Sequence, residues 1–156
     1  MNTNRQWLLA NRPHGLVGDE NFEYTETNIP EPADGEVLVR NLYLSFDPTQ
    51  RGWMEDRESY LPPVAIGEPM RAGSIGQVVE SRHADFAAGD LVQTTGGWQD
   101  FVIVSPDQTL MGLNKIPAGL PPEMMLSVLG VTGLTAYWGL LDLGQPKEGE
   151  TVLVSG

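Results

Sequence analysis

The side chains that can carry out chemistry in this sequence are hydroxyls and carboxylates, because cysteine is absent and only two histidines occur. Without cysteine there is no disulfide, no thiolate nucleophile and no cysteine-ligated zinc site. His14 and His83 stand far apart beside flexible or polar sequence, so a histidine-based metal site is not expected. Neither histidine has the setting of an acyl-transfer triad, and no pair of carboxylates stands out as a glycosidase pair. The sequence therefore predicts chemistry without a metal.

Two segments combine glycine with residues suited to contact a ligand. Gly96 and Gly97 precede Trp98, and glycine lets the backbone approach a ligand closely. Trp98 is therefore either a cleft wall or part of a β-barrel core. Thr132 and Thr135 lie in a glycine-interrupted helical segment, where they either face a ligand or permit close packing of helices. The residues alone leave both pairs of alternatives open.

Short strands separated by turns predict a mainly β fold. Glycine and proline make up 18 + 12 = 30 of the 156 residues, which indicates many turns. Alternating or β-branched runs predict strands at residues 7–10, 22–27, 36–44, 73–81, 91–94 and 98–104. Such a series is typical of a β-barrel or β-sandwich.

Two helical regions interrupt this pattern. Asp47 and Pro48 predict an N-cap and a first helical residue for a short helix through Trp53. A polar, proline-broken loop is expected to follow over residues 55–71. Residues 123–143 favour helix, with an interruption near Gly130–Gly133. Their long uncharged stretch predicts buried helices of a soluble protein, since it holds serine, threonine and glycine and has no basic flank.

The last residues predict the start of a second domain. Val152, Leu153 and Val154 form the short apolar run of a strand covered on both faces. In dinucleotide-binding domains a glycine-rich phosphate turn follows such a strand. We expect one domain over residues 1–120, then a helical bridge and the first strand of a truncated dinucleotide-binding domain over 121–156. The bridge and the final strand are expected to expose apolar surface, and so to cause self-association or disorder of about the last fifteen residues.

Charge and composition limit the classes of partner that we expect. The formal net charge is 9 − 21 = −12. Nucleic acids and anionic membranes require clustered Lys and Arg, so neither is an expected partner. A hydrophobic content of 40% is that of a folded domain. The N-terminus lacks the apolar core of a signal peptide, and a cytoplasmic location is expected.

Five segments, in this order, resemble the medium-chain dehydrogenase/reductase superfamily. The similarity is greatest to its zinc-independent branch, which contains leukotriene B4 dehydrogenase/prostaglandin reductases, plant alkenal double-bond reductases and bacterial curcumin reductase. The segments are Asn11–Gly15, Tyr43–Pro48 with Arg51 and Gly52, Ser59–Val64, Gly97–Asp100 and Leu129–Tyr137. The resemblance implies a GroES-like β-barrel with short helices, joined by a helical bridge to a Rossmann domain that this chain lacks.

The resemblance also implies an activity. Hydride would pass from NADPH to the β-carbon of an α,β-unsaturated carbonyl, an enone or enal, without zinc. The full-length enzyme would be a homodimer, and most of the NADPH site would lie beyond Gly156, so the isolated chain is expected to be inactive. The alternative is a non-catalytic GroES-like module that binds a ligand or a protein.

The resemblance assigns roles to several residues. Close relatives commonly carry a tyrosine after the Asp-Pro pair, but this sequence has Thr49, whose hydroxyl is shorter and far less acidic. We therefore hypothesise that Tyr60, which matches the Ser-Tyr-x-Pro-Pro segment, is the catalytic phenol. A packing or surface role for Tyr60 is the alternative. Thr49, Gly96, Gly97 and Trp98 are expected at the substrate, and Thr132 and Thr135 at the nicotinamide.

Overall fold

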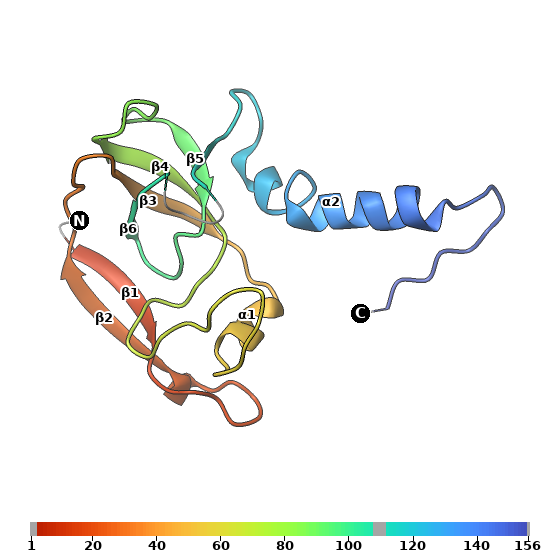
Figure 1. Cartoon of the computed structure of the whole chain (residues 1–156), viewed down its shortest axis with the longest axis horizontal. Coiled ribbons are helices and arrows are strands. Elements are labelled where there is room, and N and C mark those ends of the chain that lie inside the picture. Colours follow the sequence, from red (N-terminus) through yellow and green to blue (C-terminus); the bar gives the residue numbers. More distant parts are fainter. Residues whose placement is uncertain (1–2, 108–111, 156) are drawn as a thin grey trace.

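The computed structural model describes residues 3–107 and 112–155, as a strand-rich body from which a helical arm projects (Figure 1). The strands are β1 (Thr3–Leu9), β2 (Phe22–Asn28), β3 (Val37–Leu44), β4 (Ser74–Ser81), β5 (Leu91–Thr94), β6 (Phe101–Val104) and β7 (Asn114–Lys115). The helices are α1 (Thr49–Trp53) and α2 (Val131–Tyr137), with shorter turns η1 (Asp19–Asn21) and η2 (Pro122–Leu126) and a π-helical segment η3 (Trp138–Gly144). The predicted mainly β fold with short helices is confirmed.

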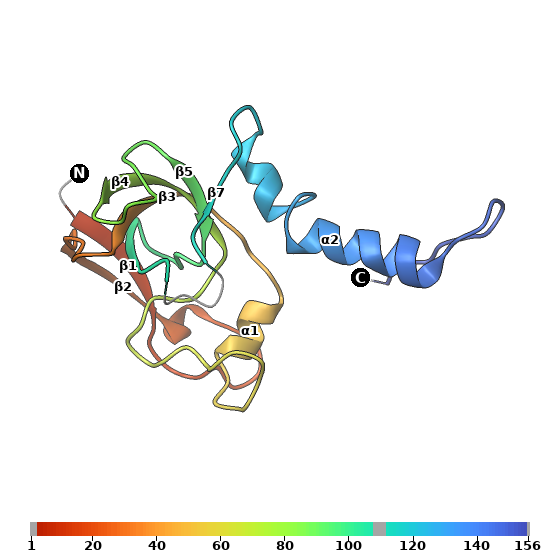
Figure 2. The same ribbon diagram turned by 45° about the horizontal axis from the view of Figure 1, so that its top comes forward.

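The strands form two antiparallel sheets. One is the β1–β2 hairpin, and the other has the order β6-β3-β4-β5-β7. Backbone bonds join them: the amide of Trp7 donates to the carbonyl of Trp98 (2.9 Å), and that of Asp100 to Arg5 (3.0 Å). The strands curve around a shared interior (Figure 2). Among the described strands this barrel is open, because β2 and β7 each pair with a single strand.

β1 starts earlier than the sequence pattern predicts. Its first residues are polar, and only Trp7–Ala10 reads as a strand. Asn4 is nevertheless buried, because its side chain accepts from the amide of Phe101 (2.8 Å) and donates to the same residue's carbonyl (2.9 Å). A buried polar group is tolerated where its hydrogen bonds are satisfied. The pairing partner that makes Asn4 a core residue lies 97 positions away.

The interior consists of two apolar clusters. The first lies within the five-stranded sheet and contains Val37, Val39, Val78, Val92, Val104 and Leu113. The second lies between the hairpin, α1 and the following loop, and contains Leu9, Met54, Val64 and Met70. The loop expected over residues 55–71 is present as turns and irregular backbone, and the second cluster anchors it at Val64 and Met70.

The helices after residue 121 form the arm seen in Figures 1 and 2. η2 starts at Pro122 and the chain is irregular before α2, close to the interruption that the glycines predict. The expectation of buried helices is wrong, since η2, α2 and η3 contain no buried residue. η2 contacts β4, whereas the apolar side chains of α2 and η3 are exposed. The predicted exposure of apolar surface is confirmed, at Val128, Leu129, Val131, Leu134, Tyr137, Trp138, Leu140, Leu141 and Leu143. In the described residues, no helix is long and apolar enough to cross a membrane.

The strand expected at Val152–Val154 is not formed. Residues 151–155 are irregular, and Leu153 is 92% exposed. A β-strand is stabilised by hydrogen bonds to a neighbouring strand, and in Figure 1 this segment runs apart from both sheets. The apolar pattern therefore does not form a strand without such a neighbour.

Gly76 is required in β4 because the paired strand β3 leaves no room for a side chain there. Its replacement tests the packing of the barrel. A Cβ at this position would lie 2.7 Å from the carbonyl oxygen of Arg40 and still closer to Val39. We expect Gly76→Ala to lower the free energy of unfolding by about 1–3 kcal/mol, because neither the backbone nor the packed valine can move freely. Urea unfolding measures the change. Gly139→Ala is the matched control, since a Cβ there meets nothing within 4 Å; equal effects of the two substitutions would contradict the packing argument.

The ion pair that joins β1 to the segment before β6 predicts a pH dependence. Arg5 Nε lies 2.6 Å from Asp100 Oδ2, and this hydrogen bond lowers the pKa of the Asp100 carboxyl against the opposing effect of burial. A carboxyl whose folded-state pKa is below its unfolded value stabilises the fold above the unfolded pKa, near 4, and loses this contribution as the pH falls through the folded value. We expect Asp100→Asn to flatten the decline of stability below about pH 4. Thermal unfolding across pH measures it, with Asp34→Asn in an exposed turn as control; an unchanged pH profile in Asp100→Asn would rule out this contribution.

Candidate functional site

The structure brings together the two predicted site residues Thr49 and Tyr60. Thr49 begins α1, and Tyr60 lies in the loop that follows this helix. Thr49 Oγ1 and the Tyr60 hydroxyl are 2.7 Å apart, with either atom able to donate. Trp53 Nε1, one helical turn beyond Thr49, donates to the Tyr60 hydroxyl (3.1 Å). The two hydroxyls therefore form one hydrogen-bonded pair, held by an indole.

The position of α1 is fixed by the segment that joins it to β3. The side chain of Gln50 is buried and donates to the carbonyl of Ser45 (2.8 Å). The predicted capping role of Asp47 is wrong. Its carboxylate accepts from the Ser45 hydroxyl (2.7 Å), α1 has no side-chain cap, and Pro48 precedes the helix instead of beginning it. Asp47 contributes through its carbonyl, which accepts from the Gln50 amide (3.0 Å).

Two arginines tie α1 to the N-terminal loop. Arg51 pairs with Glu55 (2.9 Å) and donates to the carbonyls of Pro13 (3.4 Å) and Gly15 (3.1 Å). Arg12 donates in the opposite direction, to the carbonyls of Met54 (2.9 Å) and Val64 (2.7 Å). Segment 11–15 and the loop 55–71 are thus held against each other.

The hydroxyl pair borders a shallow cleft of about 330 Å³. Residues of α1 and the following loop line it: Pro48, Thr49, Arg51, Gly52, Trp53, Glu55, Arg57, Ser59 and Tyr60. A second hollow of about 390 Å³ continues along residues 56–63. Tyr60 is 72% exposed and so accessible to a ligand.

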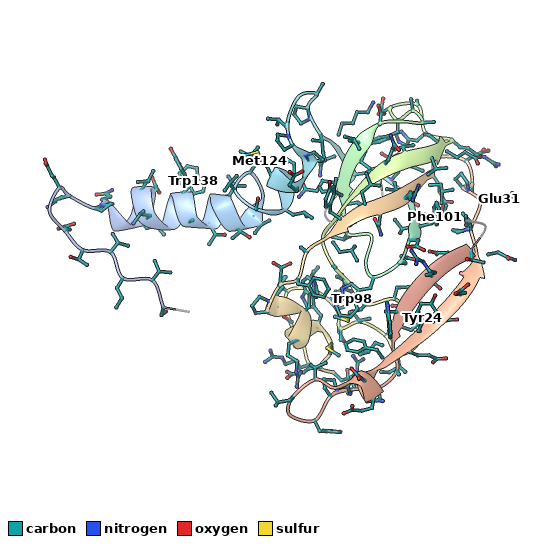
Figure 3. All side chains as sticks on the ribbon, turned by 180° about the vertical axis from the view of Figure 1, so that it is seen from behind. Tyr24, Glu31, Trp98, Phe101, Met124 and Trp138 are labelled. Carbon is teal, nitrogen blue, oxygen red and sulfur yellow. The ribbon has the colours of Figure 1, made fainter. Side chains whose placement is uncertain are left out.

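The structure places Trp98 between the hairpin and α1 (Figure 3). Its ring packs on Phe22 (5.1 Å between centroids) and Phe46 (5.3 Å), against the second apolar cluster. Its indole nitrogen is buried, and no residue of the described chain accepts from it. Phe46 is 75% exposed, so this aromatic stack extends to the surface. Trp98 itself does not line the cleft described above.

Gly96 and Gly97 are buried and closely surrounded, Gly96 by side chains and Gly97 by backbone. A Cβ on Gly96 would lie 2.5 Å from Asn41 Oδ1 and 2.6 Å from Ser74 Oγ. Gly97 has a φ of +70°, and a Cβ there would lie 2.8 Å from the carbonyl oxygen of Met70. Both positions therefore require glycine for packing within the body. Their expected contact with substrate stays a prediction.

Thr132 and Thr135 lie on α2, in the arm and apart from α1 in Figures 1 and 2. They are exposed and one turn apart on the same helix face. Thr135 Oγ1 donates to the carbonyl of Val131 (2.7 Å), which leaves its oxygen free to accept. Their expected role at a nicotinamide stays a prediction.

Charged groups with shifted pKa values lie outside the cleft. Hydrogen bonding to Lys115 lowers the pKa of Asp90, and hydrogen bonding to Glu26 raises the pKa of Tyr24. Tyr24 and Glu26 both lie on β2, and Asp90 lies in the turn before β5. Across residues 3–107 and 112–155, no three His, Asp or Glu side chains gather to form a metal site.

Comparison with known proteins identifies the family. Residues 5–113 match the family described as the N-terminal domain of oxidoreductase. The chain belongs to this family. This oxidoreductase domain is 51% identical to the NADPH-dependent curcumin reductase of Escherichia coli over 97% of its length, and 36% identical to the NADP⁺-dependent 2-alkenal reductase of Nicotiana tabacum over 98%. The expected branch of the superfamily is thereby confirmed.

A solved structure supports the fold. The CurA structure from Vibrio vulnificus in complex with NADPH is 46% identical, has a TM-score of 0.83, and matches 94% of this chain and 42% of its own. The oxidoreductase domain spans 43% of the E. coli relative and 45% of the tobacco relative.

Three residues at or beside the site were not singled out by the sequence: Trp53, Arg71 and Phe46. Arg71 lies over the Trp53 ring (5.3 Å to its centroid) and donates to the carbonyl of Pro62 (2.9 Å). The resemblance covers Phe46 within segment 43–48, which gives a signal for that residue. Trp53 and Arg71 have no local pattern, since their partners come from the folded loop.

The anchoring of the site loop by Arg12 yields a prediction. Arg12→Gln should remove at least one of two hydrogen bonds to the loop carbonyls, at about 1 kcal/mol each, and should open the loop more often. We expect trypsin to cleave after the exposed Arg57 about tenfold faster, because cleavage of a native protein follows the population of open forms. Arg12 precedes proline, so its loss removes no efficient trypsin site. Arg82→Gln, directly after the end of β4, is the control. Cleavage at Arg57 at the parental rate in Arg12→Gln would exclude the anchoring role.

Proposed function

We propose that the chain is the substrate-side part of an NADPH-dependent oxidoreductase that reduces the C=C bond of α,β-unsaturated carbonyl compounds without zinc. The observation that carries this proposal is the hydrogen-bonded pair of Thr49 and Tyr60 at an open cleft, in a domain 51% identical to a curcumin reductase. The names of the relatives support the cofactor and the substrate class, since they act with NADPH or NADP⁺ on curcumin and alkenals.

The residues of this chain act on the carbonyl end of the substrate. NADPH, when bound, supplies the hydride that is added to the β-carbon. The π electrons then move toward the carbonyl oxygen, and negative charge develops there. The Tyr60 hydroxyl donates a hydrogen bond to that oxygen, where a positioned donor stabilises the transition state most. Its proton passes to the oxygen and gives the enol. The exposed Thr49 hydroxyl relays a proton from water to the Tyr60 phenolate, since it gives its own hydrogen to the phenolate while it takes one from water. The enol then gains a proton from water at the α-carbon and loses its hydroxyl proton to water, which gives the saturated carbonyl compound.

Thr132 and Thr135 fit a contact with the carboxamide of a nicotinamide. Both hydroxyls are exposed on one face of α2, and the Thr135 oxygen is free to accept from an amide group. The chain would supply these contacts, and the remainder of the NADPH site would lie in the part of the relatives that this chain does not span.

The proposal includes a setting for the whole protein. We propose a homodimer in the cytoplasm that acts on a small molecule, with neither nucleic acid nor membrane as partner. The net charge of −12 supports the last point, because it disfavours anionic partners. Light scattering on the full-length protein tests the dimer, and a monomeric mass would contradict it. Cell fractionation tests the location, and recovery outside the cytoplasm would refute it.

The function is tested with a chimaera in which residues 1–156 replace the matching part of the E. coli reductase. We expect it to bind NADPH and consume it with a simple enone, and the 156-residue chain alone to do neither. Tyr60→Phe should lower the turnover of the chimaera by about tenfold or more, because it removes the acidic hydrogen and keeps the ring. Turnover follows from the loss of NADPH absorbance.

Tyr24→Phe is the matched control, since the Tyr24 hydroxyl is also hydrogen-bonded but lies on the hairpin. Equal turnover in Tyr60→Phe and the parent would remove Tyr60 from the mechanism. A chimaera that folds and binds NADPH but reduces no enone would refute the activity. Binding of a ligand or protein by the short chain alone would then favour a binding module.

A further inference from the structure

We propose that Trp53 is a positioning residue that fixes the direction of the Tyr60 hydroxyl, and that Arg71 holds Trp53 in place. This inference rests on the proposed function, in which the Tyr60 hydroxyl meets the carbonyl oxygen of the substrate.

Tyr60 needs support because of where it lies. Its side chain is 72% exposed, in a loop without helix or strand. An exposed side chain samples several rotamers, and fixing it costs conformational entropy. The described contacts of the Tyr60 phenol are those to Thr49 and Trp53. Thr49 is itself exposed, whereas Trp53 is half-buried and borders the second apolar cluster.

The chemistry of the indole determines what it does to the phenol. An indole N–H can only donate, so the Tyr60 oxygen accepts from Trp53. One lone-pair direction of the phenol is thereby occupied, and the Tyr60 hydrogen must point elsewhere. It points to Thr49 when no ligand is present, or to a ligand oxygen when Thr49 donates in return. Trp53 thus restricts the hydroxyl to the two orientations that a proton donor needs.

Arg71 connects this support to the core. Its guanidinium lies 5.3 Å from the centre of the Trp53 ring, a cation–π contact, and its Nη1 donates to the carbonyl of Pro62. The neighbours of Arg71 in sequence, Met70 and Ala72, are both fully buried. Arg71 therefore contacts both Trp53 and the loop that carries Tyr60, from a backbone position that the core holds in place.

The hydrogen bond is tested directly on the 156-residue chain by NMR. We expect the indole hydrogen of Trp53 to exchange with solvent about fivefold or more slowly than that of Trp7, and Tyr60→Phe to abolish the difference. Trp7 is the internal reference, since it is also partly exposed and packs edge-on against a tyrosine, Tyr24. Arg71→Gln should raise the exchange rate of the Trp53 indole with little effect on Trp7. Equal exchange of the two indoles in the parent chain would overturn the proposal.

Turnover of the active chimaera tests the positioning role. Trp53→Phe keeps an aromatic ring and removes the donor, so kcat should fall about three- to tenfold while KM changes less. In a Tyr60→Phe background the same substitution should have no further effect, because the phenol that it positions is gone. Trp7→Phe should leave both constants unchanged.

The outcomes separate this inference from the proposed function. If Trp53→Phe lowers kcat by the same factor with and without the Tyr60 hydroxyl, Trp53 is merely structural and the proposal fails. If the unsubstituted chimaera folds and binds NADPH but reduces no enone, the proposed function fails, and the exchange of the Trp53 indole still decides whether Trp53 orients the phenol.

Discussion

Both the barrel and the candidate site depend on the backbone hydrogen bonds that β1 forms along the edge that does not pair with β2. The edge opposite β2 is shared by two segments far apart in sequence. Leu9 donates to the carbonyl of Glu68 (2.9 Å), Met70 donates to Trp7 (3.0 Å), and Trp7 donates to Trp98 (2.9 Å). An unpaired strand edge exposes strong donors and acceptors. Segments 67–70 and 98–100 satisfy these donors and acceptors, and so connect the hairpin to the larger sheet.

This connection explains how the irregular loop 55–71 can carry the ordered side chain of Tyr60. The loop 55–71 is fixed at its end by β1 and at its start by α1. Arg12 donates to the carbonyl of Met54, directly before the loop, and to that of Val64 within it. Arg51 joins α1 to segment 11–15 through the carbonyl of Gly15, and Arg71 donates to the carbonyl of Pro62 within the loop. In a chain with a net charge of −12, these arginines serve internal contacts. Their planar groups of five donors suit bonds to several carbonyls at once.

The sequence predicted the elements better than their contacts. Alternating or β-branched runs identified β2 to β6, and the proline-broken loop was also recognised. The polar start of β1 was missed because the burial of Asn4 depends on Phe101. The final strand was wrong for the opposite reason: its apolar pattern is present, but no described strand lies beside it. Local patterns carry no information about such distant partners.

In the candidate site, too, some of the residues could be predicted but their contacts could not. Tyr60 and Thr49 were identified through a family resemblance, and their 2.7 Å contact is a property of the fold. Trp53 could not be recognised as a site residue from the sequence, because a tryptophan in a short helix is typical of a core residue. The Trp53 side chain does pack against the second apolar cluster. Its nitrogen, however, reaches the phenol. The next residue, Met54, is buried in the second apolar cluster, so the tryptophan that binds the exposed Tyr60 hydroxyl is directly followed by a core residue. That proximity allows a side chain on an exposed loop to be ordered by the core.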